Sequence, residues 1–174
     1  LIDLVSAAHS KGLKVILDVV PNHTADYFNG ASSTYSSASY QPAAPFNNPD
    51  WYHHYGDITD WNNEYQVLNY DLGGLDDLNQ DNADARQAIK DAYKNWITLT
   101  GADGIRVDAA RSMPKNFLQE FESYVGVPSF GEIFVGDVDY VSAFSNYEWG
   151  VLDFPLFFQA REVFAHDASF TTVK

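Results

Sequence analysis

The stretch GLKVILDVVPNH, residues 12–23, decides the fold of this chain. Leu, Val and Ile dominate it as far as Pro21 and Asn22, which end the run. A short, nearly continuous apolar run that ends at turn residues is typical of a strand buried on both faces, as in a parallel sheet. Residues 1–11 repeat apolar positions at helical spacing, and Gly12 suits the end of that helix.

Helices and strands alternate again after residue 82. The hydrophobic pattern predicts helices at 84–100, 114–124, 137–145 and 156–165, and strands at 103–108, 127–133 and 149–153. The first of these helices, capped by Asp84 and closed by Gly101, should turn one apolar face to the core: Ala85, Ala88, Ile89, Ala92, Trp96 and Leu99. This alternation predicts right-handed βα units and a parallel sheet.

Two architectures fit this alternation, a β/α barrel and an open doubly wound sheet. The nucleotide-binding form of the open sheet is disfavoured, because no G-x-G-x-x-G or G-x-x-x-x-G-K-[ST] pattern follows a predicted strand. The alternation alone does not decide between a β/α barrel and an open sheet of another kind.

The segment 22–82 is rich in Ser, Asn, Asp, Gly, Tyr and Pro and has few periodic runs. An unstructured loop of that length is uncommon in a compact domain, so we interpret it as a small irregular subdomain inserted between a strand and a helix. The chain then divides into a helix and strand at 1–21, the inserted subdomain at 22–82, and further helices and strands at 83–174. Because it begins inside an apparent helix, we expect a fragment of a longer protein.

The composition excludes several classes of protein. Hydrophobic residues make up 45% and charged residues 20% of the 174 residues, as in globular chains. A formal net charge of −14 disfavours nucleic acid and anionic membranes as partners, and no apolar stretch approaches the roughly 20 residues of a membrane span. The absence of cysteine excludes thiol chemistry. Aromatic residues, at 16%, could form ring-stacking surfaces or simply an aromatic-rich core.

Residues able to do chemistry follow the predicted strands, where the active sites of such folds lie. They are Asp18, Asn22 and His23 after the first strand, Arg106 and Asp108 after the second, Glu132 after the third and Asp153 after the fourth. Two carboxyl groups on different strand ends suit glycoside hydrolysis, in which one protonates the leaving oxygen and the other attacks the sugar. Arg106 should lie on the same side of its strand as Asp108 and hold it ionised. A purely structural ion pair explains the spacing equally well.

Four segments resemble signature regions of the α-amylase family of glycoside hydrolases, in the family's order and at similar separations. They are DVVPNH at 18–23, LDDLN at 75–79, GIRVDAAR at 104–111 and GEIF at 131–134. The segment DWYHHYGDITDWNN at 50–63 is also of a kind common in the family's inserted subdomain. The resemblance implies a (β/α)₈ TIM barrel with an irregular subdomain after the third strand, of which this chain would hold about strands three to six.

The resemblance also implies the role of each candidate residue. Asp108 would be the nucleophile and Glu132 the general acid/base of a retaining mechanism, with their carboxyl groups about 5–5.5 Å apart. Arg106 would orient Asp108, and His23 would hydrogen-bond the sugar at the cleavage site. Asp18 would be a structural residue beneath the site.

A structural Ca²⁺ ion between barrel and subdomain is the cofactor that the resemblance implies. Asn22 and Asp77 match two of its ligands, both hard oxygen donors of the kind that calcium prefers, and the backbone carbonyl of Ser112 would be a third. The alternative for Asp77 is a turn residue, since the sequence around it is rich in turn formers.

Several positions near the site differ from the family pattern or decide specificity. Arg111 and Ser112 stand where relatives often have Lys-His on the leaving-group side; Arg111 can donate to sugar hydroxyls, whereas Ser112 cannot act as histidine would. Glycines 73 and 74 stand where cyclodextrin-forming relatives carry an aromatic residue, which favours a hydrolase. Phe134 is a candidate sugar-stacking residue, with packing between barrel and helix as the alternative.

The family's fourth signature region ends in His-Asp, and FAHD at 164–167 imitates it. This segment continues a predicted helix without an intervening strand, so we place the true region beyond Lys174 and expect the fragment alone to be inactive.

We therefore expect retaining endo-hydrolysis of α-1,4-glucosidic bonds in starch-like glucans, by a secreted monomer whose signal peptide lies outside this chain. One alternative is an α-glucan transglycosylase or cyclodextrin glucanotransferase of the same family. Another is a catalytically inactive carbohydrate-binding protein, against which the intact acid, nucleophile and arginine argue.

Overall fold

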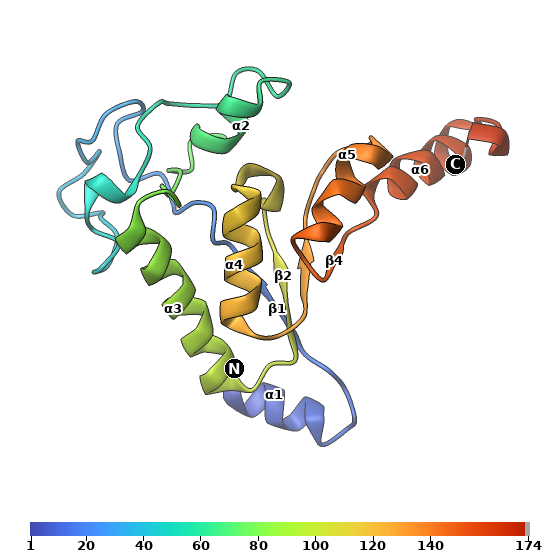
Figure 1. The fold of residues 1–174 in the computed structure, drawn as a ribbon, viewed down its shortest axis with the longest axis horizontal. Coiled ribbons are helices and arrows are strands. Elements are labelled where there is room, and N and C mark those ends of the chain that lie inside the picture. Colours follow the sequence, from blue (N-terminus) through green and yellow to red (C-terminus); the bar gives the residue numbers. More distant parts are fainter. Residues whose placement is uncertain (173–174) are drawn as a thin grey trace.

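The computed structural model describes residues 1–172, and its centre is a four-stranded parallel sheet (Figure 1). The strands lie in chain order: β1 Ile16–Val19, β2 Gly104–Val107, β3 Ser129–Gly131 and β4 Gly150–Val151. Each strand pairs in parallel with the next, so all carboxyl ends meet at one edge of the sheet. The unbroken order is that of part of a β/α barrel, because a doubly wound sheet reverses its order at a switch point.

The helices lie within a few residues of their predicted positions. Their bounds are Ile2–His9 (α1), Ala83–Thr100 (α3), Lys115–Val125 (α4), Val138–Ser142 (α5) and Phe154–His166 (α6), with short 3-10 helices at Ala110–Ser112, Ala143–Asn146 and Phe170–Thr172. The cap of α3 is Asn82, not Asp84 as predicted, because the Asn82 side chain accepts hydrogen bonds from two N–H groups of the first turn. No helix among residues 1–172 is long and apolar enough to cross a membrane.

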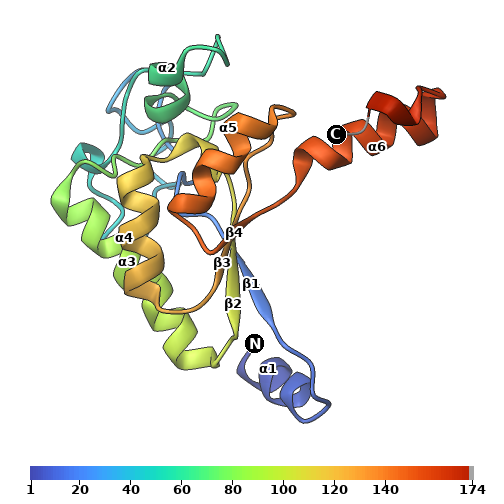
Figure 2. The same cartoon turned by 45° about the vertical axis from the view of Figure 1, so that its right-hand side comes forward.

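The core lies between the sheet and helices α3 and α4, which run side by side in both views (Figures 1 and 2). It contains Ile89 and Ile97 of α3, Ile105 and Val107 of β2, and Phe117, Leu118, Phe121 and Val125 of α4. Each such side chain contributes roughly 1.5–3 kcal/mol when buried, so this core holds β2 against the two helices. By contrast, α6 projects away from the sheet (Figure 2).

Two predictions about burial are wrong. The first strand is not buried on both faces: Ile16 is 52% exposed, because β1 is an edge strand that pairs only with β2 in the described part of the chain. Trp96 and Leu99, predicted to face the core, are 50% and 60% exposed, whereas Ile97 is buried. The same edge explains both errors, since no described strand lies beyond β1 to cover that side of α3.

Between β1 and α3 the chain forms an irregular segment above the carboxyl ends of the strands (Figure 1). It contains the 3-10 helix Pro49–Trp51, the short helix α2 (Glu64–Asn69) and several isolated β-bridges. The buried rings of Phe28 and Tyr52 meet edge to face within it, 5.0 Å apart. Its far end returns to the sheet, because His23 pairs with Asp77 in an antiparallel bridge. This bridge brings residues 54 positions apart in sequence to the strand ends.

Candidate active site

The sheet register brings the candidate residues of neighbouring strands together. Asp18 lies opposite Arg106 in the β1–β2 ladder, one residue before each strand ends. The ladder continues one step further, because the N–H groups of Asp108 and Glu132 donate to carbonyls of β1 and β2 at 2.8 and 2.9 Å. The main chain thus fixes Asp108 and Glu132 at adjacent strand ends.

The Arg106 guanidinium is shared among three carboxyl groups. Its Nη1 donates to Asp108 Oδ1 at 2.5 Å and to Asp18 Oδ1 at 2.8 Å, and its Nη2 lies 2.7 Å from Glu132 Oε1. The alternation of side chains along the strand predicts the contact between Arg106 and Asp108. The additional contact with Glu132 means that Arg106 joins both candidate catalytic carboxyl groups, which a simple pair with Asp108 would not do. The side chains of Asp108 and Glu132 are 27% and 23% exposed, so the site is partly buried yet open to a ligand.

The site combines an arginine whose pKa is raised with a histidine whose pKa is lowered. Burial lowers the pKa of Arg106, but its hydrogen bonds with Asp18 and Asp108 and the charge of Glu132 outweigh this effect and raise the pKa overall. Burial lowers the pKa of His23, and the nearby charge of Asp108 opposes that shift. The charge of Asp108 therefore acts on the His23 imidazole. Because its pKa is lowered, His23 is a neutral hydrogen-bonding group near pH 7.

Ala109 turns the chain sharply after Asp108. Its φ of 51° lies in the left-handed region, which is unfavourable for a residue with a Cβ atom. The turn leads into the 3-10 helix Ala110–Ser112 and aims the Ala109 N–H at Glu132, which accepts through Oε2 at 3.3 Å. One carboxyl oxygen of Glu132 thus faces Arg106 and the other faces the main chain after β2.

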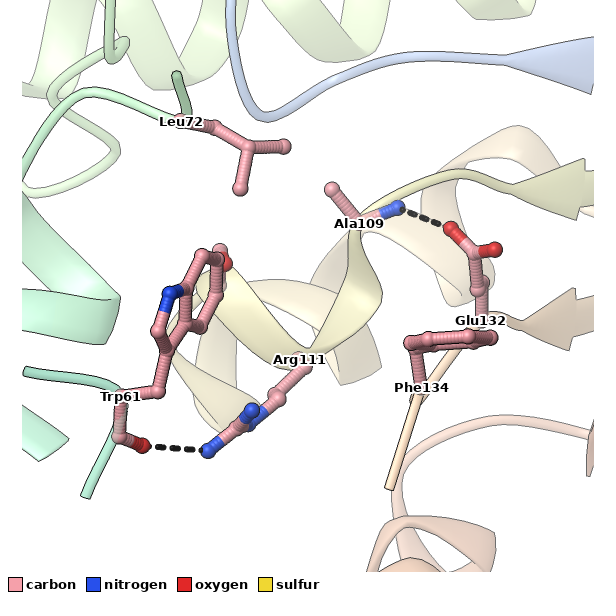
Figure 3. Close-up of a pocket in the computed structure, with 7 residues that line it drawn as sticks. Trp61, Leu72, Ala109, Arg111, Glu132 and Phe134 are labelled. Carbon is pink, nitrogen blue, oxygen red and sulfur yellow. Dashed lines mark hydrogen bonds between the residues drawn. The ribbon is translucent and has the colours of Figure 1, made fainter. Parts of the chain in front are cut away.

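A pocket of about 540 Å³ opens beside Glu132 (Figure 3). It is lined by Trp61, Leu72, Ala109, Arg111, Ser112, Glu132 and Phe134. Trp61 and Leu72 come from the irregular segment, and the other residues follow β2 or β3. The pocket is therefore a cleft between the irregular segment and the strand ends.

Arg111 joins the two walls of this pocket. Its Nη2 donates to the backbone carbonyl of Trp61 at 2.7 Å (Figure 3), and its guanidinium lies over the rings of Trp61 and Tyr140 at 5.6 and 5.5 Å. The Tyr140 hydroxyl reaches Glu64 of α2 at 3.1 Å. Arg111 thus anchors the irregular segment to the chain after β2, in addition to facing the pocket where the sequence places it.

Phe134 packs against α6, as the alternative for its sequence position predicts, and it also faces the pocket. Its ring packs edge to face on Phe154 and Phe158 of α6, at 4.7 and 5.2 Å between ring centroids. The side chain is still 58% exposed and lines the pocket opposite Trp61 (Figure 3). An aromatic side chain with one face packed and another open is suited to stack on a ligand.

Asn22 and Asp77 place two oxygen atoms without hydrogen-bond partners near the end of β1. Both side chains are fully buried, and neither Asn22 Oδ1 nor Asp77 Oδ1 has a partner among the described residues. Their main chains are adjacent, since Leu78 N donates to Asn22 O at 2.9 Å. Burial first, and the charge of Asp71 second, raise the pKa of Asp77 well above its usual range, whereas Asn22 lowers it.

These two oxygens fit a calcium ion. Buried acceptors without partners are rare and need an explanation, and a buried carboxylate is costly unless a positive charge compensates it. An amide oxygen and a carboxylate oxygen are ligands that calcium takes. In the described chain no group of three or more His, Cys, Asp or Glu side chains could hold a metal, so main-chain oxygens or water would have to complete the shell. Ser112, whose backbone carbonyl is the third ligand that the family resemblance implies, is buried and lines the pocket beside Arg111.

Three residues of the pocket escaped the sequence analysis. Trp61 carried a signal, because it lies in the aromatic-rich segment 50–63, but nothing in its local pattern assigns it to the site. Leu72 and the strained Ala109 carry no signal of their own. Asp153, a candidate from its strand-end position, instead caps α6 through a hydrogen bond from Leu156 N at 2.9 Å.

The comparisons with known proteins agree with this geometry. The family description "Alpha amylase, catalytic domain" matches residues 1–145. The chain is 40% identical over 176 residues to a β/α-amylase of Paenibacillus polymyxa, covering 99% of this chain and 14% of that protein. It is also 40% identical over 127 residues to a cyclomaltodextrin glucanotransferase of Klebsiella oxytoca, covering 70% of this chain and 19% of that protein.

A solved structure gives the same result for the fold. The α-amylase of Geobacillus thermoleovorans, complexed with acarbose, superposes with a TM-score of 0.77 at 32% identity, covering 92% of this chain and 35% of that one. The chain thus spans well under half the length of these relatives. It contains part of their α/β barrel, with Asp108 and Glu132 at adjacent strand ends of that part. The chain belongs to the α-amylase family of glycoside hydrolases.

Proposed function

We propose that this chain supplies the nucleophile and the acid/base of an enzyme that hydrolyses α-1,4-glucosidic bonds of starch-like glucans internally, with retention of configuration. The observation that carries the proposal is the shared guanidinium: Arg106 lies 2.5 Å from Asp108 and 2.7 Å from Glu132. Two carboxyl groups held on adjacent strand ends, beside an open pocket, are what a double displacement at a sugar carbon needs.

In the first step Glu132 gives its proton to the glycosidic oxygen while an Asp108 oxygen attacks the anomeric carbon. The bond to the leaving sugar breaks, and a glycosyl ester of Asp108 forms. In the second step Glu132, now a carboxylate, takes a proton from water, whose oxygen attacks the same carbon and displaces Asp108. Two inversions give net retention.

The surrounding residues position these groups and the substrate. Arg106 holds the carboxyl group of Asp108 in place before bond formation. His23, neutral and close to Asp108, would donate to a hydroxyl of the sugar at the cleavage site. Trp61 and Phe134 face the pocket from opposite walls, where they would stack on the leaving part of the glucan, and Arg111 would donate to its hydroxyls.

Calcium is part of the proposal as a structural ion. Asn22 Oδ1 and Asp77 Oδ1 would hold it, with the carbonyl of Ser112 as a further ligand. When bound, the ion supplies positive charge that ties the irregular segment to the end of β1. Without the ion, Asn22 Oδ1 and Asp77 Oδ1 are two buried oxygens that no described group compensates.

Transfer to a second sugar is the competing reaction, since relatives of both types match this chain. Glycines 73 and 74 favour hydrolysis. Both adopt positive φ, and a Cβ on Gly73 would meet nothing within 4 Å, so no side chain fills that space. A glucan therefore finds no ring there around which to fold. We propose that the enzyme acts as a monomer outside the cell, where polymeric glucans are accessible.

Azide rescue of the full-length protein tests the two catalytic roles separately. With α-maltosyl fluoride, whose leaving group needs no proton, Asp108→Ala should lose activity by at least roughly 10³-fold. Azide entering in place of Asp108 displaces fluoride in one step and should give the β-glycosyl azide. In Glu132→Ala, azide instead replaces water in the second step and should give the α-glycosyl azide. The same azide anomer from both variants would refute the assignment.

The product pattern decides between the candidate functions. Hydrolysis of maltoheptaose should give shorter linear maltooligosaccharides, and longer or cyclic products would show a transglycosylase. An intact protein that binds soluble starch in the presence of calcium but never cleaves it would be a binding protein.

A further inference from the structure

His53 lies directly against the candidate calcium ligand Asp77. Its ring Nδ1 is 2.7 Å from Asp77 Oδ2, and the two side chains are 12% and 0% exposed. The main chains are also joined, because His53 N donates to Asp77 O at 3.0 Å. A half-exposed tyrosine, Tyr55, stacks on the imidazole with 17° between the ring planes. The imidazole therefore has a fixed position and a fixed partner.

This contact leaves the two carboxyl oxygens of Asp77 in different situations. Oδ2 lies within hydrogen-bond distance of His53 Nδ1, whereas Oδ1 is buried and has no partner among residues 1–172. A backbone hydrogen bond from Asp77 N to Asp71 Oδ1, at 3.1 Å, fixes the residue from its other side. Rotation of the carboxyl group would break the His53 contact, so Oδ1 keeps one direction.

Asn22, which follows β1, has its side chain held in a similar way. Its backbone carbonyl accepts from Leu78 N at 2.9 Å and from Gln80 Nε2 at 3.3 Å. Its side-chain Nδ2 lies 3.3 Å from His23 Nδ1, which leaves Asn22 Oδ1 without a partner. Each of the two ligands thus uses one polar atom for support and keeps one buried oxygen unused.

We propose that His53 is a positioning residue for the cation site: it donates through Nδ1 to Asp77 Oδ2 and so presents Asp77 Oδ1 to calcium. The inference rests on the calcium part of the proposed function. A group that hydrogen-bonds to the polar atom of a ligand side chain that does not bind the metal fixes the orientation of that side chain. Loss of such a group typically weakens metal binding about 10–100-fold.

Three substitutions in the full-length protein separate positioning from packing. His53→Leu removes the donor and keeps an apolar side chain. His53→Asn restores a donor, because the Asn side-chain nitrogen stands where the imidazole Nδ1 stood. His54→Leu is the matched control: His54 is the next residue and also partly buried, but it bonds to Pro49 O at 2.9 Å rather than to Asp77.

Calcium affinity from titration calorimetry, and the unfolding temperature in calcium and in chelator, are the readouts. We expect His53→Leu to raise the Kd for calcium roughly 10–100-fold, and His53→Asn and His54→Leu to stay within about threefold of the original protein. The extra unfolding temperature that calcium confers should shrink in His53→Leu alone. A purely structural role would lower the unfolding temperature equally with and without calcium.

Two results would overturn the inference while leaving the calcium site intact: unchanged affinity in His53→Leu, or affinity in His53→Asn as weak as in His53→Leu. An original protein that binds no calcium would overturn the calcium site and the role of His53 together. None of these three results affects the catalytic roles, which azide rescue tests independently.

Discussion

Glu148, just before β4, is a buried carboxyl group that forms no ion pair with any of residues 1–172. It is 5% exposed, and its Oε2 has no hydrogen-bond partner among the described residues. It packs behind Gly131, in the space that a side chain at that position would occupy. Burial first, and the charge of Glu122 of α4 second, raise the pKa of Glu148 to about 8. Its protonation therefore couples folding to pH.

The sign and size of this coupling follow from the two pKa values. The folded protein keeps a proton on Glu148 that the unfolded chain, with a pKa of 4.5, releases. Stability should therefore fall as pH rises from about 4.5 to about 8 and then level off. At 1.36 kcal/mol for each pKa unit, the loss amounts to about 3 kcal/mol at pH 7 and about 5 kcal/mol above pH 8.

Glu148→Gln should remove this loss, because glutamine has the shape of the protonated acid and does not ionise. Urea denaturation of the intact protein, followed by tryptophan fluorescence between pH 5 and pH 8, measures the difference in unfolding free energy. We expect the variant to exceed the original protein by little at the acidic end and by about 3 kcal/mol at pH 7.

Glu120, on the same helix as Glu122, gives a control of opposite sign. Hydrogen bonds from Lys90 first and Arg86 second lower the pKa of Glu120. Its ionised carboxylate therefore stabilises the fold at pH values above its pKa in the unfolded chain, and this contribution disappears as the pH falls. Glu120→Gln should therefore weaken the protein near pH 7. Parallel pH curves for Glu148→Gln and the original protein would refute the reasoning about Glu148.

Three further substitutions test the site and its support. Gly131→Ala should destabilise by about 1–3 kcal/mol or more, since its Cβ would collide with Glu148 Oε2, and combining it with Glu148→Ala should recover part of the loss in denaturation midpoint. Arg106→Lys should lower kcat on starch at least roughly 10²-fold with a small change in KM, because an ammonium cannot hold both carboxyl groups. Trp61→Ala should raise KM for maltoheptaose roughly three- to tenfold through lost stacking and leave the hydrolysis of α-maltosyl fluoride nearly unchanged.

The sequence predicts the part of the site that depends on periodicity. Side chains alternate along a strand, so Arg106 and Asp108 had to share a side, and parallel strands bring their carboxyl ends to one edge. The segment FAHD likewise lies at the end of α6 and in its cap, as its helical pattern requires. These features need only local rules and the order of the elements.

Other contacts depend on tertiary placement that no local pattern encodes. His53 and Asp77 are 24 residues apart in a segment without periodicity, and only its folded path brings them to 2.7 Å. Glu148 is of a type usually found at the surface, so its burial has no sequence signal except the glycine at 131, which leaves room for it. The exposed side of α3 was mispredicted because a helical pattern shows which face is apolar and not what covers it.

The charge balance of the site bears on how the proposed reaction gains speed. One guanidinium faces three carboxyl groups, those of Asp18, Asp108 and Glu132, and the nearby histidine is neutral. Even with Glu132 protonated, the cluster carries excess negative charge. A neutral glucan gains nothing from that charge on binding, whereas the positive charge that develops on the sugar ring in the transition state is attracted to it. Fixed groups that interact more strongly with the transition state than with the bound substrate raise kcat rather than lower KM. Replacing Asp18 by Asn would therefore reduce kcat more than it changes KM, although Asp18 need not touch the substrate.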